Sequence, residues 1–381
     1  MPISVPLRSR TPVMFPRPLR GRIERPRFVS DVLEGNPWHD PVERELQVYL
    51  PPSGRTEGLP LLVLLSGYTG AGFLQFQRPR YLSDSRVGQL DRLIRTGVAG
   101  EAVMVSPDCM TTLGGSQYVN SSATGRYEDY ITEEIIPWVR ERYGTGPVGV
   151  LGTSSGGYGA LSLALRHPDI FSAAASDSGD MYFEYGYLPE FPRAFRAIRQ
   201  AGGPEALLRR IFARPIDGWG PLHPMASGLE HMAYASCYSP VDDAPGRFEL
   251  PFDLTTGALR PEIWAKWLAR DPVRMIARPR YARALRRLRY VYVDGGEEDE
   301  WNLDVAARIF AAAARAQGAT IDHQEFSGRH SDVAPRYEVI LPRILRALGA
   351  PGRKVEPFLR TGPRRGRSTR RPSRPRAKRA R

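Results

Sequence analysis

Short apolar runs alternate with helix-like stretches along most of this chain of 381 residues. Parallel strands need a long, usually helical, connection between them, so this alternation predicts a largely parallel sheet with helices on both faces. The expected fold class is therefore α/β. The strand-like runs cover 44–50, 59–67, 101–108, 147–154, 170–179, 287–296 and 319–328, and the helical patterns cover 125–144, 156–167, 302–318 and 338–349.

Two of the strand-like runs allow more specific expectations. The runs at 44–50 and 59–67 are separated only by the turn-like "PPSGRTEG", which favours neighbouring strands. The run at 147–154 is apolar on both faces, as is typical of a buried strand in a parallel sheet.

Residues 180–286 interrupt the alternation. This segment is rich in Pro, Tyr, Trp and Arg, and it shows helical patterns at 194–212 and 260–276. We expect a helical, cap-like insertion over the carboxyl ends of the strands, where it would shape a substrate pocket. The alternative is a second helical packing layer with no role in binding.

The net charge of +13 is concentrated at the two ends of the chain. Residues 353–381 hold 13 Lys and Arg against one acid, and residues 1–30 hold 7 against one, which leaves 31–352 at −5. We therefore expect a flexible basic extension over 1–29, one α/β domain over 30–350 and a disordered basic tail over 351–381. The tail would either bind a non-specific anionic partner or act as a solubilising extension.

Several classes of protein are disfavoured by composition. Two cysteines argue against a disulfide framework and against a thiolate zinc site, and we predict no cofactor and no metal. No run reaches the roughly 18 apolar residues of a membrane span. The N-terminal stretch lacks the apolar segment of about 7–15 residues found in secretory signals, so we expect a cytoplasmic protein. Composition leaves the oligomeric state open.

The stretch "GTSSGGYGAL" at 152–161 contains the pattern G-x-S-x-G between an apolar run and a helical pattern. A nucleophilic serine there occupies a strained strand-to-helix turn that crowds the residues two before and two after it. Ser154 has Gly152 and Gly156 at those positions, whereas Ser155 has the branched Thr153 at one of them. The spacing therefore selects Ser154 as the nucleophile and leaves Ser155 to donate its backbone N–H to an oxyanion.

A dinucleotide phosphate loop is the competing interpretation of the same stretch. That pattern needs a glycine where Tyr158 stands, and it belongs on the first strand of its domain rather than on the fourth. We therefore disfavour it.

A serine hydroxyl needs an imidazole base to become a nucleophile, and in this architecture the acid and then the histidine follow the serine on later loops. Of the six histidines, only His330 follows the last strand-like run directly. The acid is expected after the run at 287–296, in "DGGEEDEWNL". We choose Asp299, which lies far enough along the loop to reach His330, and we keep Asp294 and Glu298 in reserve.

The second oxyanion donor is expected in "LSGYTGAG", after the run at 59–67. The glycines of this segment let the backbone approach a substrate closely, and the N–H of Tyr68 is the candidate donor.

These segments together resemble the α/β-hydrolase family of esterases that includes esterase D (S-formylglutathione hydrolase), the enterochelin-esterase-like enzymes and the secreted mycolyltransferases. The resemblance rests on "GTSSGGYGAL", "SDSGDMYFEYGY", "DGGEEDEWNL" and "GRHSDVAPRYEVILPRILRAL", and it covers roughly 30–350. It implies a Ser154–Asp299–His330 triad. It also implies that the loop "GGSQYVNS" borders the active site, with Ser116, Gln117 and Tyr118 as substrate-binding candidates.

The expected function is hydrolysis of small-molecule carboxylic esters through an acyl-enzyme. One alternative is an acyltransferase that passes the same acyl group to an acceptor other than water. A second alternative is a non-catalytic binding protein that keeps the fold.

Overall fold

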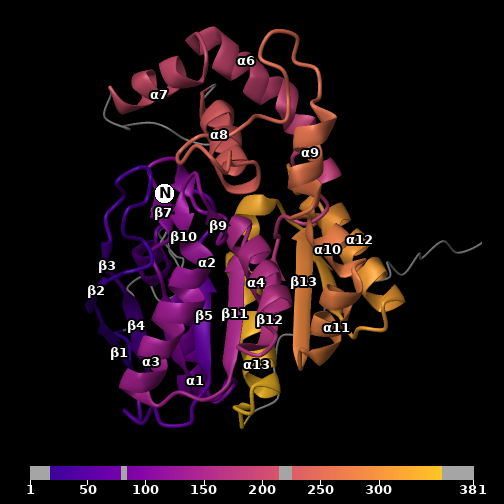
Figure 1. Ribbon diagram of the computed structural model, residues 1–381. Coiled ribbons are helices and arrows are strands. Elements are labelled where there is room, and N and C mark those ends of the chain that lie inside the picture. The colour runs from indigo at the N-terminus through magenta and orange to yellow at the C-terminus, as the bar shows by residue number, and fades with distance from the viewer. Residues whose placement is uncertain (1–17, 79–83, 214–224, 354–381) are drawn as a thin grey trace, which may run out of the picture.

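An eight-stranded sheet forms the centre of the computed structural model, which describes residues 18–78, 84–213 and 225–353 (Figure 1). Strand β4 runs antiparallel to both of its neighbours, and the other neighbouring pairs of this sheet are parallel. In spatial order the strands are β1 (Arg22–Glu24), β4 (Gln47–Leu50), β6 (Val103–Ser106), β5 (Leu61–Leu65), β11 (Val148–Thr153), β12 (Phe171–Asp177), β13 (Tyr290–Gly296) and β14 (Asp322–Phe326).

Three short two-stranded ladders lie outside the main sheet. They pair β2 (Arg27–Val29) with β3 (Glu43–Glu45), β7 (Met110–Thr111) with β8 (Gly114–Gly115), and β9 (Asn120–Ser121) with β10 (Gly125–Arg126).

The strand-like runs of the sequence coincide with strands, but two expectations need correction. Strands β4 and β5 are not neighbours, because β6 lies between them and pairs with both. The extension expected over 1–29 is part of the fold from residue 18 onward. In that part β1 pairs with β4, and the backbone N–H groups of Arg20 and Gly21 donate to the carboxylate of Asp91. The basic tail expected over 351–381 lies almost entirely outside the described residues.

Helices cover both faces of the sheet. Helices α1 and α13 pack together on one face, and α3, α4 and α12 contribute to the core on the other. The helices are α1 (Arg86–Thr96), α2 (Tyr127–Asp129), α3 (Ile136–Tyr143), α4 (Ser155–Arg166), α5 (Phe183–Gly186), α6 (Phe191–Ala201), α7 (Pro204–Phe212), α8 (Ala226–Tyr238), α9 (Pro261–Leu268), α10 (Pro272–Ile276), α11 (Pro279–Arg287), α12 (Leu303–Ala316) and α13 (Tyr337–Ala347). Short helical turns are η1 (Gly72–Phe76), η2 (Tyr130–Ile135), η3 (Leu188–Glu190), η4 (His330–Asp332) and η5 (Ala334–Arg336).

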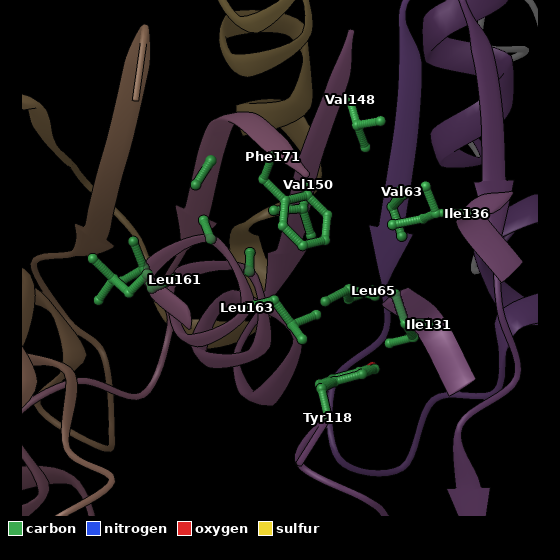
Figure 2. Close-up of a cluster of buried hydrophobic side chains, with 14 of the residues drawn as sticks. Val63, Leu65, Tyr118, Ile131, Ile136, Val148, Val150, Leu161, Leu163 and Phe171 are labelled. Carbon is green, nitrogen blue, oxygen red and sulfur yellow. The ribbon is translucent and has the colours of Figure 1, made fainter. Parts of the chain in front are cut away.

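The two-residue period of the strands divides the core between these faces. Along β5, Val63 and Leu65 belong to the cluster that packs against η2, α3 and α4, whereas Leu62 and Leu64 belong to the cluster that packs against α1 and α13. Figure 2 shows Val63 beside Ile136, and Leu65 beside Ile131 of η2. Strand β11 is divided in the same way, with Val150 in the first cluster and Leu151 in the second, so it is buried on both faces as its sequence pattern predicted.

The segment 180–286 divides into two parts. Helices α6, α7, α8 and α9 gather beyond one end of the sheet and share a separate aromatic-rich core (Figure 1). Helices α10 and α11 instead lie beside β13 and pack against α12 and α4. The cap is thus shorter than the insertion expected from the sequence. Across the described residues, no helix is long and apolar enough to cross a membrane.

A buried ion pair ties the last elements to the sheet. The guanidinium of Arg336 in η5 donates to Asp294 of β13 at 2.8 Å, and it also donates to Gln324 of β14 at 2.7 Å. The side chain of Asp294 is fully buried and that of Arg336 nearly so. A buried carboxylate is tolerated only while its partner is present.

We predict that Arg336→Leu lowers the free energy of unfolding by about 3–5 kcal/mol, because it leaves the Asp294 carboxylate buried without its partner. Urea denaturation measures the change. Arg308→Leu is the matched control, since Arg308 pairs with Glu325 at a similar distance of 2.8 Å but is largely exposed, so its loss should cost about 1 kcal/mol or less. Equal losses in the two variants would contradict the prediction.

Candidate active site

Ser154 lies in a strained turn between β11 and α4. Its φ of +58° falls in a region that residues other than glycine rarely adopt. Two backbone hydrogen bonds hold this conformation: the N–H of Ser154 donates to the carbonyl of Asp177 at 3.0 Å, and its carbonyl accepts from the N–H of Tyr158 at 3.0 Å. The side chain of Ser154 is partly exposed, whereas residues 155–165 of α4 are buried. The fold therefore presents this one hydroxyl and encloses the helix behind it.

The glycines on either side of Ser154 are enclosed by backbone atoms. A Cβ on Gly152 would lie 2.5 Å from the carbonyl oxygen of Gly156, and a Cβ on Gly156 would lie 2.4 Å from the carbonyl oxygen of Leu65. These carbonyl oxygens belong to the backbone, so they cannot move aside as the end of a flexible side chain can. The structure thus shows the crowding from which the sequence argument selected Ser154 over Ser155.

The imidazole of His330 and the carboxylate of Asp299 form a hydrogen bond. His330 begins η4 just after β14, Asp299 follows β13, and the distance from Nδ1 to Oδ2 is 2.8 Å. The other carboxylate oxygen of Asp299 accepts from the backbone N–H of Trp301 at 2.9 Å. The side chain of Asp299 is fully buried, and that of His330 is 17% exposed. The carboxylate therefore fixes the imidazole and leaves its other nitrogen available.

Burial by itself lowers the pKa of His330, but the hydrogen bond and the negative charge of Asp299 outweigh it. The charges of Asp180 and Glu300 act in the same direction, so the pKa of His330 lies above its usual value. The indole of Trp301 packs edge-on against the imidazole, with ring centroids 4.7 Å apart. Among the described residues, no hydrogen bond joins Ser154 to His330. Active-site hydrogen bonds of this kind often tighten only when substrate is bound.

The two reserve acids lie elsewhere. Asp294 is buried in the ion pair with Arg336 and also accepts from the hydroxyl of Tyr292 at 2.6 Å. Glu298 is exposed and lies 4.0 Å from Arg329. Of the three candidate acids, the structure brings Asp299 to the histidine.

The segment after β5 lies directly beside Ser154. A Cβ on Gly67 would be 3.6 Å from the Cβ of Ser154. The next residue, Tyr68, is anchored at both ends, since its carbonyl accepts from the N–H of Gly115 at 2.8 Å and its hydroxyl donates to the carbonyl of Leu113 at 2.8 Å. The backbone N–H of Ser155 is in the first turn of α4, where helical N–H groups have no partner within the helix. Gly67, the residue before Tyr68, and Ser155 therefore both lie next to Ser154.

The substrate-binding candidates of the "GGSQYVNS" loop are all buried. The amide of Gln117 donates to the Ser155 hydroxyl at 2.9 Å, and the hydroxyl of Tyr118 donates to the carbonyl of Ser66 at 2.5 Å. Ser116 accepts from the N–H of Tyr118 at 3.3 Å. These side chains are thus buried beside the elbow, and their contact with a substrate stays a prediction.

Three residues near the site were missed by the sequence analysis. Asp180 accepts hydrogen bonds from Ser155 and from Tyr187 of the insertion, and Trp301 packs on His330. Asp180 could have been found as an acid just after the strand that follows the elbow. No sequence pattern marks Tyr187, because only the folded insertion brings it to Asp180.

The described part of the chain contains no cluster of metal-binding side chains and no disulfide. No group of three or more His, Cys, Asp or Glu side chains is placed there to hold a metal ion. Cys109 and Cys237 are buried and unpaired.

Comparison with known families gives a match over most of the chain. The family model described as "Putative esterase" matches residues 41–346. Among curated proteins, the chain is 36% identical over 92 residues to the MPT51 antigen of Mycobacterium leprae, and the match covers 20% of this chain and 31% of that protein. It is 34% identical over 91 residues to the MPT51/MPB51 antigen of Mycobacterium tuberculosis, covering 22% of this chain and 29% of that protein. The match thus spans under a third of each relative.

Solved structures share the fold over nearly their whole length. An S-formylglutathione hydrolase from Agrobacterium tumefaciens superposes with a TM-score of 0.56 at 15% identity, covering 87% of this chain and 98% of that one. A ferulic acid esterase superposes with a TM-score of 0.53 at 19% identity, covering 87% and 100%. This chain therefore has the α/β-hydrolase fold.

We predict that Gly156→Ala destabilises the protein by about 1–3 kcal/mol, because the added methyl group would press on the backbone of Leu65. Gly67→Ala is the matched control, since its Cβ would make only ordinary contacts at 3.6 Å. Thermal unfolding compares the two. A Gly156→Ala protein as stable as Gly67→Ala would show that the elbow is not crowded as described.

Proposed function

The chain belongs to the Putative esterase family, and from this starting point we propose that it is a serine hydrolase that cleaves carboxylic esters. In this proposal Ser154 is the nucleophile, His330 the general base and Asp299 the acid that orients the base. The observation that carries it is the 2.8 Å hydrogen bond between His330 and the buried Asp299. The two residues lie on the loops after β13 and β14, at the same end of the sheet as the strained Ser154 turn.

The hydrogen bond to Asp299 determines which nitrogen of His330 can act. Nδ1 faces the carboxylate, so the neutral imidazole carries its proton on Nδ1 and donates a hydrogen bond from there to Asp299. Nε2 is then unprotonated and can accept the proton of the Ser154 hydroxyl as Oγ attacks the ester carbonyl. The imidazolium that forms is stabilised by the adjacent carboxylate. It then returns the proton to the leaving alcohol.

The oxyanion that develops on the carbonyl needs donors that are already in place. The backbone N–H groups of Ser155 and Tyr68 fit this role because they flank Ser154 and belong to a helix start and to an anchored segment. A donor held before the reaction costs no reorganisation at the moment of charge development.

Water completes the cycle by attacking the acyl-enzyme, again with His330 as base. The same acyl-enzyme could pass its acyl group to an alcohol or a thiol, as in an acyltransferase. Product analysis with a p-nitrophenyl ester in the presence of candidate acceptors separates the two reactions. Free acid as the main product supports hydrolysis, and a new ester or thioester supports transfer.

We predict that Ser154→Ala lowers kcat for a p-nitrophenyl ester by roughly 10⁴- to 10⁶-fold and abolishes labelling by a fluorophosphonate probe, because nucleophile and base act as a unit. Ser155→Ala is the matched control at the neighbouring serine. It keeps its backbone N–H, so it should retain labelling and lose far less activity. Labelling that survives in Ser154→Ala would refute the assignment.

We predict that kcat/KM rises with pH through a midpoint above 6.5, since the base must be neutral and the pKa of His330 is raised above that value. Asp299→Asn removes the main cause of the increase, so the midpoint should move to lower pH while kcat falls about 10⁴-fold. A pH–rate profile of each protein measures both effects. An unchanged midpoint in Asp299→Asn would mean that a different group is titrating.

A further inference from the structure

Asp180 is a buried carboxylate between the two halves of the site. It lies just after β12, and in the sheet β12 is between β11, which leads to Ser154, and β13, which leads to Asp299. Only 6% of Asp180 is exposed. None of the ion pairs in the described part of the chain involves it. Burying a carboxylate without a paired cation costs free energy, so other interactions of Asp180 must stabilise it.

Hydrogen bonds connect Asp180 to the residue after the nucleophile. The hydroxyl of Ser155 donates to Oδ2 of Asp180 at 3.2 Å, and the same hydroxyl accepts from the amide of Gln117 at 2.9 Å. The Ser155 side chain is therefore held from two sides, with its single proton directed at the carboxylate. Since Ser155 is also the proposed oxyanion donor, this pair of bonds fixes the orientation of the first turn of α4.

The insertion reaches the same carboxylate. The hydroxyl of Tyr187, which precedes η3, donates to Oδ2 of Asp180 at 2.9 Å. The ring of Tyr187 packs against Tyr234 of α8 and Trp267 of α9, with centroids 4.7 and 5.7 Å apart. Asp180 thus joins the core of the cap to the start of α4.

The charge of Asp180 also acts on the base. Burial raises the pKa of Asp180 to about 6, while hydrogen bonds from Tyr187 and Ser155 and the charge of His330 oppose that increase. In the other direction, Asp180 helps to raise the pKa of His330. The titratable groups that face this pair are Asp299, Glu300, Tyr187, Glu230, Tyr234 and Tyr238.

Unusual backbone conformations frame the same carboxylate. Positive φ values occur at Ser154, at Gln117 and at Ser178 and Tyr182, which flank Asp180 closely in the chain. Strained residues of this kind concentrate at functional sites, where the surrounding structure holds them in place.

We propose that Asp180 is a positioning residue of the active site, which holds Ser155 in place through its hydroxyl and links it to the cap through Tyr187. This inference rests on the proposed function, because it assigns Ser155 and His330 their catalytic roles. It goes beyond the triad by adding a second carboxylate and by linking the cap to the oxyanion donor.

The test is Asp180→Asn, which keeps the shape of the side chain and removes its charge. We expect kcat to fall about ten- to a hundredfold, less than the 10²–10³-fold that follows outright loss of an oxyanion donor. We also expect the acid midpoint of kcat/KM to move to lower pH, because one of the charges that raises the pKa of His330 is gone. The variant should be at least as stable as the wild type at pH 7, since a costly buried charge is removed.

Asp271→Asn is the matched control. Burial also raises the pKa of Asp271 to about 6, but this carboxylate caps α10 and does not contact Ser155. Asparagine can still cap the helix, so neither kcat nor the pH midpoint should change. Ser155→Ala provides a second approach. The rate losses of Ser155→Ala and Asp180→Asn should be less than additive in the double variant if Asp180 acts through Ser155.

The outcomes distinguish this inference from the proposed function. If the wild type reacts with a fluorophosphonate at Ser154 and hydrolyses esters, but Asp180→Asn matches it in kcat and in pH midpoint, the role of Asp180 is refuted and the function stands. Full additivity with Ser155→Ala would likewise refute the link through Ser155. If the wild type neither reacts nor hydrolyses esters, the proposed function itself fails.

Discussion

The strained turn at Ser154 is the constraint on which the site depends. A positive φ at a residue with a side chain costs about 1–3 kcal/mol and persists only where the surroundings enforce it. Here the enforcing elements are the buried helix α4 and the two strands that neighbour β11 in the sheet, which supply the carbonyl of Asp177 from β12 and the backbone of Leu65 from β5. The three central strands and the first turn of α4 therefore act together to place the partly exposed Ser154 hydroxyl.

Parallel topology brings the other groups to the same place. Ser154, Asp180, Asp299 and His330 each follow a different strand, and β11 to β14 are consecutive neighbours in the sheet. Residues that are far apart in the chain thus lie at the same end of the sheet, at the carboxyl ends of neighbouring strands, although no sequence pattern connects them. The negative charges of two carboxylates, Asp299 and Asp180, act on one imidazole and favour its protonated form.

The sequence predicted the parts of this arrangement that follow local rules. Steric crowding selected Ser154, and chain order selected His330 and Asp299, because both arguments need only neighbours along the chain or the order of strands. It did not predict that β6 separates β4 from β5, since strand pairing depends on packing across the sheet. It also missed helix α8 and the contact of Tyr187 with Asp180, because these depend on how the insertion folds onto itself.

The hydrogen bond from Tyr187 to Asp180 has a consequence for engineering the substrate range of this enzyme class. A cap that touched only substrate could be exchanged between relatives as an independent module. This cap donates a hydrogen bond to a carboxylate that also contacts Ser155 of the elbow, so a transplanted cap without that hydroxyl would leave the carboxylate with one donor fewer. Chimeras would need a hydroxyl at the equivalent of Tyr187, and selection for new specificity would act on catalytic rate at the same time.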